Sequence, residues 1–461
     1  MFYQNTIAAI ATSGKNGSIS VIRVSGEQSL EKVSEIFFDG KGSNINLENS
    51  ETHKVHYGFI CNRKKEVVDE VLVIVMKGPR SYTAEDVVEI QCHGGSFICQ
   101  EIMKLLLECG VSVAEPGEFT KRAFLNGRLD LSQAESVMDV IQSNSNLALQ
   151  NSLSQLRGNV KEKIVSLREL ILKDIAFLEA ALDDPEHIPL DDFSETMSNH
   201  VEIVKKEVNH LLENSQNGRI IKEGIKTAIV GKPNVGKSSF LNCILREERA
   251  IVTDIPGTTR DTLEEEVRIG STLLRLIDTA GIHRTEDKVE HIGIEKAKQS
   301  IQEADFVICI LDGSNSLSQE DTFVLEEAKE CPGVILLNKS DLSSMILEED
   351  IPNYENKKIL SFSASEGTGL KELEDYLTEL FLQDKISYND EIYITNMRQK
   401  QALLETMESI NQLSQSIDDG MPEDFYSIDL TNAYEALGKI IGETIEDDIV
   451  DKIFKDFCMG K

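Results

Sequence analysis

One octapeptide in the middle of the chain restricts the fold more than any other feature. The string Gly231-Lys232-Pro233-Asn234-Val235-Gly236-Lys237-Ser238 follows a predicted strand at 226–230 and precedes a predicted helix at 239–245. In this context the glycines let backbone amides surround a phosphate, and the helix N-terminus adds its positive dipole end. The string therefore predicts a phosphate-binding loop in an α/β domain, with Lys237 directed at phosphate oxygens and Ser238 at Mg²⁺.

Three later strings, each at the end of a predicted strand, extend this prediction to GTP. Asp278-Thr279-Ala280-Gly281 suits Mg²⁺ through water and the γ-phosphate. Asn338-Lys339-Ser340-Asp341 follows the apolar run 334–337, and a carboxylate there accepts hydrogen bonds from guanine N1 and its exocyclic amine, which adenine does not offer. Ser363-Ala364-Ser365 then supplies a backbone amide to the guanine oxygen.

The net charge of the chain excludes some classes of binding partner. Asp and Glu number 80 against 47 Lys and Arg, for a net charge of −33. Such a field repels phosphate backbones and anionic lipid, so a protein that coats nucleic acid is excluded. Only residues 119–174 have a small basic excess. The chain has no run of about 18 apolar residues and no signal peptide, and its eight cysteines include no C-x-x-C pair, so we expect a cytoplasmic protein with no membrane contact.

Hydrophobic periodicity divides the rest of the chain. Short β-branched runs at 19–24, 70–75 and 87–90, with a helical stretch at 99–109, predict an α+β domain. Apolar positions between 149 and 182 step by three or four and predict one long helix, followed by another at about 194–214. Upstream, Ser132-Gln133-Ala134-Glu135 predicts a capping box.

These patterns predict a multidomain α/β protein in which a P-loop GTPase (Ras-like) domain is inserted in an α-helical domain. The expected boundaries are 1–118 for the α+β domain, 119–219 and 384–461 for the two parts of the helical domain, and 220–383 for the inserted GTPase domain.

Strings in all three regions resemble the MnmE (TrmE) family of tRNA-modification GTPases. The chain ends Phe457-Cys458-Met459-Gly460-Lys461, similar to the F-C-[I/L/V]-G-K terminus of that family. Thr253-Asp254-Ile255-Pro256-Gly257-Thr258-Thr259-Arg260-Asp261 resembles its switch I. The N-terminal resemblance rests on four strings, at 21–26, 85–95, 116–128 and 129–135.

The resemblance implies a reaction and its partners. Members act as homodimers, and as heterotetramers with the FAD-dependent MnmG (GidA), to place an aminomethyl or carboxymethylaminomethyl group on carbon 5 of the wobble uridine of certain tRNAs. Tetrahydrofolate, as the 5-formyl or 5,10-methylene form, supplies the one-carbon unit in the N-terminal domain, and the nitrogen donor is ammonium or glycine. The residues that match the family's folate pocket are Arg23, Glu89, Arg128 and Lys461.

The resemblance also completes the expected GTP site. The implied GTP-binding residues are Asn234, Val235, Gly236, Lys237, Ser238, Ser239, Thr253, Asp254, Ile255, Pro256, Gly257, Thr258, Thr259, Asp278, Thr279, Ala280, Gly281, Asn338, Lys339, Asp341, Ser363, Ala364 and Ser365. Mg²⁺ would be held by Ser238 and Thr259, and K⁺, in the place of an arginine finger, by Asn234, Thr253, Ile255 and Thr258.

Two residues have a predicted catalytic role with an alternative beside it. Ile282 stands where a Ras-like protein has a water-orienting Gln, so the resemblance assigns the general base to Glu290, whose alternative is a solvated carboxylate. Cys458 is either a thiol nucleophile or a residue that shapes the site. Two other functions stay open: a GTP-dependent assembly or stress-signalling switch without modification chemistry, and a folate-binding regulator.

Overall fold

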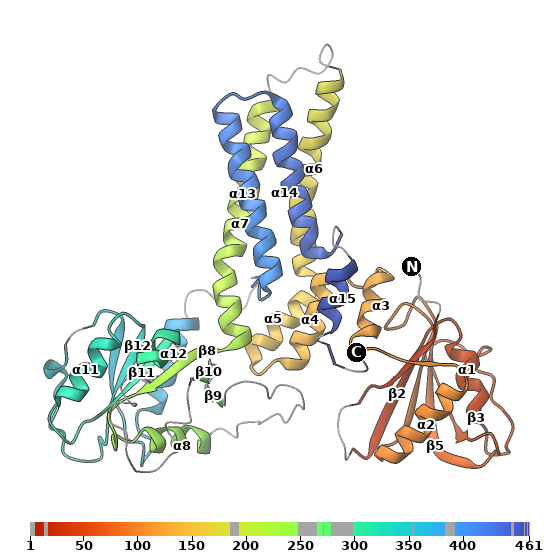
Figure 1. Cartoon of the computed structure of the whole chain (residues 1–461), viewed down its shortest axis with the longest axis horizontal. Helices are drawn as coiled ribbons and strands as arrows, with labels where there is room; N and C mark the ends of the chain where they lie inside the picture. The colour runs from red at the N-terminus through yellow and green to blue at the C-terminus, as the bar shows by residue number, and fades with distance from the viewer. Residues whose placement is uncertain are drawn as a thin grey trace. The chain divides into compact units, whose positions relative to one another are not determined.

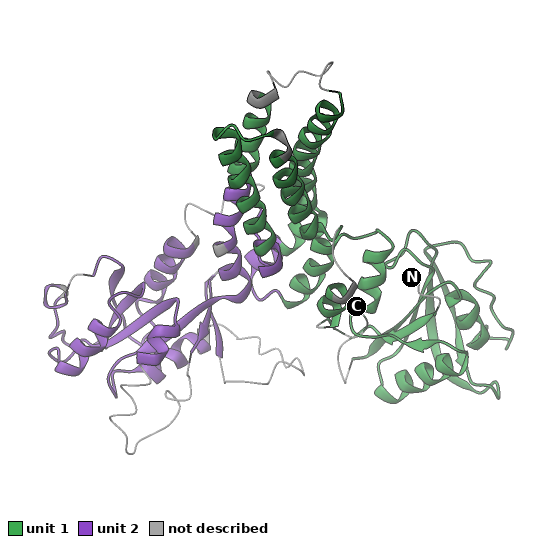
Figure 2. Cartoon of the chain, turned by 45° about the horizontal axis from the view of Figure 1, so that its top comes forward, with its two compact units in different colours: residues 1–142, 152–206, 401–461 green, residues 143–151, 207–400 purple. Residues whose placement is uncertain are grey.

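The computed structural model describes residues 5–12, 17–184, 193–247, 265–270, 272–277, 298–352, 354–382, 392–443, 447–455, 457–458 and 460. Residue contacts divide the chain into two units (Figure 2). Unit 1 comprises residues 1–142, 152–206 and 401–461, and unit 2 comprises residues 143–151 and 207–400. Because unit 1 takes residues from both sides of unit 2, the α/β domain is inserted in the sequence of the helical domain.

A seven-stranded sheet forms the N-terminal part of unit 1, as the β-branched runs predict. In spatial order its strands are β3 (Phe37–Phe38), β4 (Lys54–Cys61), β5 (Val67–Met76), β6 (Val87–His93), β2 (Ile19–Ser25), β1 (Ile7–Ile10) and β7 (Ser112–Val113). Neighbouring strands are antiparallel except β1 and β7. Two helices, α1 (Ser29–Ile36) and α2 (Ser96–Glu108), pack against this sheet (Figure 1).

The two faces of this sheet differ in burial. The face toward α1 and α2 holds a fully buried core that includes Ile22, Val73 and Ile90. On the other face, pairing between strands places Tyr57 opposite Leu72, and both are exposed, by 59% and 41%. Successive side chains of a strand point to opposite faces of a sheet. Tyr57 and Leu72 therefore point away from α1 and α2, which cover the other face. The sheet therefore has one packed face and one open face that carries exposed apolar side chains.

The helical part of unit 1 uses chain from both sides of the inserted domain. Its helices are α3 (Glu118–Leu125), α4 (Leu131–Gln142), α6 (Asn159–Asp183), α14 (Glu423–Ile441), α15 (Asp447–Lys455), most of α13 (Met397–Asp418) and the first turns of α7 (Phe193–Glu223). Figure 1 shows α6, α7, α13 and α14 side by side in a bundle. Leu131 and Met138 of α4 share a buried cluster with Phe454 of α15, so the two separated chain segments build one core.

The prediction of a single helix from 149 to 182 is wrong. The apolar stripe is divided between α5 (Asn146–Arg157) and α6, with Gly158 between them at φ +100°. A left-handed residue cannot continue an α-helix, and glycine adopts that conformation without steric cost. The helix predicted at 194–214 is confirmed but runs on to Glu223.

The predicted capping box also lies two residues too late. The side chain of Asp130 accepts a hydrogen bond from the backbone N–H of Gln133 at 3.1 Å, and the side-chain oxygen of Gln133 accepts from the backbone N–H of Asp130 at 3.0 Å. The reciprocal pair that starts α4 is therefore Asp130 and Gln133, because a carboxylate three residues before a Gln competes with the Ser132–Glu135 pair for the same free amides.

Six strands form the sheet of unit 2. Their order is β13 (Lys357–Ser361), β12 (Gly333–Asn338), β11 (Phe306–Asp312), β8 (Ile225–Val230), β10 (Thr272–Leu276) and β9 (Glu265–Ile269), all parallel except β9. The other described elements are α8 (Lys237–Glu247), α11 (Gln319–Glu327), α12 (Leu370–Leu382) and a 3₁₀ turn (Glu348–Asp350). Every residue of β11 and β12 is buried, as expected when both faces of a parallel sheet are covered.

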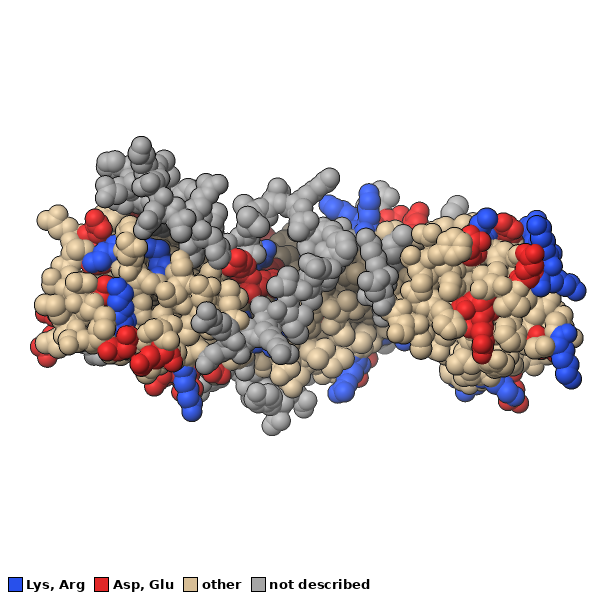
Figure 3. Space-filling view, turned by 90° about the horizontal axis from the view of Figure 1, so that it is seen from below, with Lys and Arg blue, Asp and Glu red and all other residues tan. Residues whose placement is uncertain are grey.

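Charged side chains of both signs lie on the surface of the described residues. On the face drawn in Figure 3, Lys and Arg lie among Asp and Glu over the described residues. Within the described part of the chain, no helix combines the length and the hydropathy that crossing a bilayer requires.

Candidate functional site

The phosphate-binding string forms the turn between β8 and α8. Gly236 has φ +101°, and a Cβ atom there would lie 2.2 Å from Nδ2 of Asn338. Only glycine fits this position, because any side chain would both strain the backbone and displace a residue of the base-reading string. Asn234 also has a positive φ, +63°. The loop therefore has the tight curvature that turns successive amides toward an anion.

Lys237 begins α8 and folds back over the loop. Its Nζ donates to the backbone carbonyls of Gly231 at 2.6 Å and Lys232 at 2.8 Å. Burial lowers the pKa of Lys237 from its usual value. A phosphate oxygen would replace these carbonyl partners and favour the charged ammonium, so the side chain is placed to respond to an anion. Ser238 and Ser239 follow in the first turn of the same helix.

Asn338, at the end of β12, links the phosphate loop to the strand after it. Its Nδ2 donates to the carbonyl of Val235 at 2.7 Å, and its Oδ1 accepts from the backbone N–H of Ala364 at 3.0 Å. The side chain is 2% exposed, so both bonds are made away from water. Asn338 thus fixes the spacing between the phosphate loop and the Ser363–Ser365 string.

Asp341 is oriented by serines from the neighbouring strand end. Ser363 Oγ donates to Asp341 Oδ1 at 2.6 Å, and the Ser363 and Ser365 hydroxyls are 2.9 Å apart. The hydrogen bond from Ser363 lowers the pKa of Asp341 below its usual value. An ionised, solvent-exposed carboxylate with a fixed direction is the acceptor that two guanine N–H groups require.

Two supporting carboxylates lie outside the motifs from which the site was predicted. Asp312 ends β11 and forms an ion pair with Lys339, Nζ to Oδ2, at 2.7 Å. Asp321, in the first turn of α11, forms an ion pair with Lys232 of the phosphate loop, also at 2.7 Å. For Asp312 the available signal is an acidic residue at the end of an apolar run, the same pattern that singles out Asp278; Asp321 instead belongs to the capping box of α11.

Parallel strands bring the described GTP residues together at one edge of the sheet. β8, β12 and β13 lead into the phosphate loop, the Asn338–Asp341 string and the Ser363–Ser365 string. Several predicted residues lie outside the described part of the chain. They are Thr253, Asp254, Ile255, Pro256, Gly257, Thr258, Thr259, Asp278, Thr279, Ala280, Gly281 and Glu290.

In unit 1, two of the four predicted folate residues, Arg23 and Arg128, lie over one aromatic ring, and a third, Glu89, pairs with Arg23. The guanidinium carbons of Arg23 and Arg128 lie 4.8 Å and 5.0 Å from the ring centroid of Tyr82, a residue that the sequence did not single out. Tyr82 itself is fixed by its hydroxyl, 2.8 Å from Oγ1 of the buried Thr120. Glu89 pairs with Arg23 at 2.9 Å, Nε and Nη2 donating to the same oxygen. Lys461 lies outside the described residues.

A buried arginine supports the loop that carries Tyr82. Arg122 is 1% exposed and pairs with Glu85 at 3.1 Å and Glu118 at 2.9 Å. Glu85 also accepts from Ser25 Oγ at 2.9 Å. A buried charge is stable only when its partners are in place, so this cluster holds the loop against β2 and α3.

The C-terminal segment reaches the same region. Arg23 Nη1 donates to the carbonyl of Gly460 at 3.4 Å, and the carbonyl of Cys458 accepts from the backbone N–H of Gly117 at 3.3 Å. Cys458 is exposed, and none of the described cysteines is in a disulfide. Among the described residues, no group of three or more His, Cys, Asp and Glu side chains is arranged to hold a metal ion.

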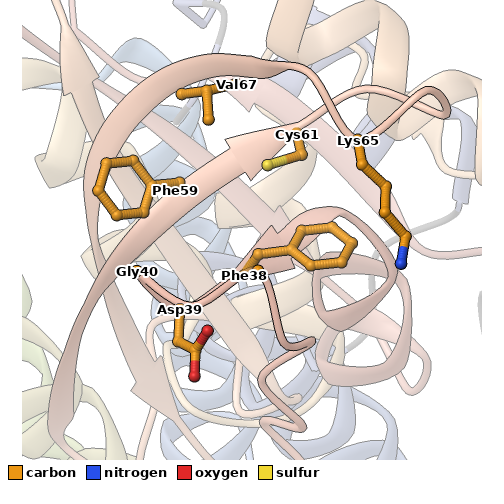
Figure 4. Close-up of a pocket in the computed structure, with 8 residues that line it drawn as sticks. Phe38, Asp39, Gly40, Phe59, Cys61, Lys65 and Val67 are labelled. Atoms are coloured by element: carbon orange, nitrogen blue, oxygen red, sulfur yellow. The ribbon is translucent and has the colours of Figure 1, made fainter.

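A separate hollow lies at the edge of the N-terminal sheet (Figure 4). Its volume is ≈ 200 Å³, and Phe38, Phe59 and Val67 form much of its lining. The Asp39 carboxylate accepts from the backbone amides of Lys41 and Ser43 and so serves its own loop. The lining includes none of the predicted site residues, which places the candidate chemistry elsewhere.

Known proteins resemble this chain over nearly its whole length. The model of the GTP-binding protein TrmE N-terminus matches residues 6–128, and that of the MnmE helical domain matches residues 131–458. The tRNA modification GTPase MnmE of Lachnoclostridium phytofermentans is 54% identical over 99% of both chains. That of Clostridioides difficile is 45% identical over 100% of both. The FeoB G-domain from Methanococcus jannaschii, a solved structure, is 24% identical over 34% of this chain and 97% of its own, with a TM-score of 0.25.

Proposed function

Since the chain belongs to the MnmE (TrmE) family of tRNA modification GTPases, we propose that it binds and hydrolyses GTP and that this turnover drives the modification of tRNA. The observation that carries the proposal is the shared edge of the unit 2 sheet. There the phosphate loop, Asn338 and the Ser363-oriented Asp341 lie together, joined by hydrogen bonds of 2.6 to 3.0 Å. Phosphate and guanine recognition are thus preorganised in one site.

Mg²⁺ and K⁺ belong to this proposal as groups that the chain would hold. Ser238, in the first turn of α8, and Thr259 would ligate Mg²⁺; Asn234, Thr253, Ile255 and Thr258 would hold K⁺. Oxygen ligands of this kind suit both cations. When bound, the cations offset the negative charge that grows on the phosphates during hydrolysis. Glu290 is the proposed general base, acting through a water.

The monovalent cation gives a direct test of the GTPase proposal. We expect GTP turnover at saturating Mg²⁺ to be at least tenfold faster in K⁺ than in Na⁺, because the cation would take the place of an arginine finger, which itself contributes roughly 10³ to 10⁵ in rate. The measurement is phosphate release at constant ionic strength. Equal rates in the two salts would contradict the potassium assignment and leave GTP hydrolysis itself standing.

The modification reaction is proposed for the Tyr82 region of unit 1. Arg23, Arg128 and Lys461 supply cations for the glutamate tail of 5-formyl- or 5,10-methylene-tetrahydrofolate, and the carboxylate of Glu89 suits the amide edge of the pterin. With the FAD-dependent partner MnmG (GidA), the chain would add an aminomethyl or carboxymethylaminomethyl group to carbon 5 of the wobble uridine. The proposed site of action is the cytoplasm.

The open face of the N-terminal sheet supports the proposal of a homodimer. Exposed apolar side chains gather there: Ile19 is 65% exposed, Val55 54% and Tyr57 59%. Strand pairing continues this face from Val55 through Ile74 to Glu89 and Arg23. An apolar surface next to a proposed binding site is typical of a subunit interface. The heterotetramer with MnmG belongs to the same proposal. The four domain ranges that the sequence predicts are also retained as part of it.

Nucleoside mass spectrometry of a deletion strain separates this function from its alternatives. We expect the wobble uridine to be unmodified without the gene and modified again when the gene is restored. Normal nucleosides in that strain would favour the assembly or signalling switch, and folate binding without a change in tRNA would favour the regulator. A Cys458→Ser variant that restores the modification fully would exclude the thiol nucleophile.

A further inference from the structure

The segment from Asp312 to Asp321 connects β11 to α11 and contributes none of the family's nucleotide motifs. Each of its ends nevertheless holds a lysine from one of those motifs. Asp312 pairs with Lys339 of the base-reading string, and Asp321 pairs with Lys232 of the phosphate loop, both at 2.7 Å. The carboxylate side chains of Asp312 and Asp321 are 7% and 2% exposed, whereas Lys339 and Lys232 are 35% and 19% exposed, so the carboxylate is the buried member of each pair.

Hydrogen bonds from its own loop orient the Asp312 carboxylate in addition to the ion pair with Lys339. Its Oδ1 accepts from the backbone N–H of Ser314 at 3.0 Å and from the Ser314 hydroxyl at 2.6 Å, and its Oδ2 accepts from Asn315 Nδ2 at 2.9 Å. Burial alone would raise the pKa of Asp312, but the hydrogen bonds from Lys339, Ser314 and Asn315 outweigh it and hold the pKa at about 2. The group is therefore a permanent anion at a defined place.

This anion determines where the Lys339 side chain runs. Asp312 and Asn338 are register partners on neighbouring strands, and Lys339, with φ +67°, sends its ammonium across that strand pair. A lysine whose ammonium is anchored offers its methylene stem as an apolar surface. The methylene stem of Lys339 lies at the sheet edge where the base-reading strings meet. The flat face of a nucleobase bound at that edge could therefore pack against the stem.

The other end of the segment acts on the phosphate loop. Asp321 Oδ2 receives Lys232 Nζ and, in a reciprocal helix cap, the backbone N–H and hydroxyl of Ser318 at 3.0 Å and 2.7 Å. Lys232 is the residue directly after Gly231, whose carbonyl holds Lys237. The first turn of α11 thereby fixes the backbone from which the Lys237 contacts are made.

We propose that Asp312 and Asp321 are positioning residues for nucleotide binding, which fix Lys339 and Lys232 from the two ends of one segment. The inference rests on the proposed GTP binding and extends it to a segment outside its motifs. Because a long, flexible lysine loses rotamer freedom when it is ordered, fixing it in advance lowers the cost of binding. The effect should appear as slower release of nucleotide.

The test follows release of a fluorescent GDP, mant-GDP, from the full-length protein by stopped flow. We expect Asp312→Asn and Lys339→Met each to raise the dissociation rate about tenfold, with the association rate changed less than twofold. The double variant should be no worse than either single variant, because both remove the same interaction. Glu320→Gln, an exposed carboxylate next to Asp321 on α11, is the matched control and should release mant-GDP at the wild-type rate.

A parallel cycle with Lys232→Met and Asp321→Asn tests the other end and should show the same coupling. Should Asp312→Asn fail to fold, Ser314→Ala loosens the carboxylate without removing its charge and should also speed release. Effects that add within a pair, or wild-type rates in the single variants, would overturn the inference. Wild-type protein that does not bind mant-GDP would instead overturn the proposed GTP binding.

Discussion

In the proposed GTP site, base selection is assigned to the charge of a single exposed side chain, Asp341. The Ser363–Ala364–Ser365 string, which the sequence assigns to the base pocket, lies beside this carboxylate, and Ser363 donates to Asp341. The sequence does not single out Asp312 or Tyr82, because neither belongs to a motif. Each contacts a residue that does: Asp312 pairs with Lys339, and Tyr82 lies under Arg23. Their roles depend on strand order, which the sequence does not encode locally.

Asp341→Asn should reverse the choice of base. The amide can no longer accept from both guanine N–H groups but can donate to the second oxygen of xanthine. Two charge-assisted hydrogen bonds are worth about 1.5–3 kcal/mol each, so GTP affinity should fall by roughly 100-fold or more. Fluorescence titration with mant-GTP and mant-XTP measures it, with Glu366→Gln as the control at a neighbouring exposed carboxylate. An unchanged preference for GTP would exclude Asp341 from the base pocket.

The depressed pKa of Asp312, about 2, gives a pH dependence of stability. An aspartate in the unfolded chain has a pKa of about 3.9, so the stabilisation is complete above that value and is lost as the pH falls toward 2. The Tm difference between wild type and Asp312→Asn should therefore be constant from pH 8 to pH 5 and shrink below about pH 4. Thermal unfolding followed by circular dichroism checks this. A difference that already shrinks between pH 8 and pH 6 would require another titrating group.

At the scale of elements, the spacing of apolar residues predicted helical structure but not where each helix ends. The apolar residues from Leu149 to Leu182 keep a spacing of three or four across Gly158. Because the break between α5 and α6 is a single residue, it leaves no gap in that spacing from which the end of α5 could be predicted. The strands of unit 2 were more predictable, since buried runs such as Val334–Leu337 end in polar motifs. The Asp130 cap was missed because two overlapping boxes fit the same stretch.

Substituting Gly158 should destabilise the junction between α5 and α6. At φ +100° an alanine is strained by about 1–2 kcal/mol, whereas asparagine tolerates positive φ better. We expect Gly158→Ala to lower the free energy of unfolding by about that amount and Gly158→Asn to lower it less, measured by urea denaturation. If alanine stabilised the protein, α5 and α6 would be one continuous helix in solution.

For the whole molecule, composition and motif order predicted an inserted domain but not which surfaces remain open. Ile19, Tyr57 and Leu72 are apolar residues on strands, and the sequence alone places them in a core as readily as at a surface. Only the position of α1 and α2 on the opposite face shows that they are uncovered in the single chain.

Charges on the open face should separate the proposed dimer. Tyr57→Glu with Leu72→Glu places two carboxylates in the centre of that face, opposite each other on β4 and β5. Light scattering after size-exclusion chromatography should then report a monomer of 51.4 kDa in place of twice that mass. Leu404→Glu, on α13 and 45% exposed, is the control and should leave the dimer intact. A dimer that persists in the double variant would locate the interface elsewhere.

The hydrogen bond between Arg23 and Gly460 joins residues 437 positions apart, and this separation has a consequence for biosynthesis. A ribosome adds about 5–20 residues per second, so roughly 20 to 90 s pass between the synthesis of the two partners. During that interval the N-terminal sheet can fold, yet the Arg23 region lacks its last contacts. A nascent or prematurely ended chain would therefore carry a folded first domain without the Gly460 contact, and the order of synthesis makes the surroundings of Arg23 one of the last parts of unit 1 to be completed.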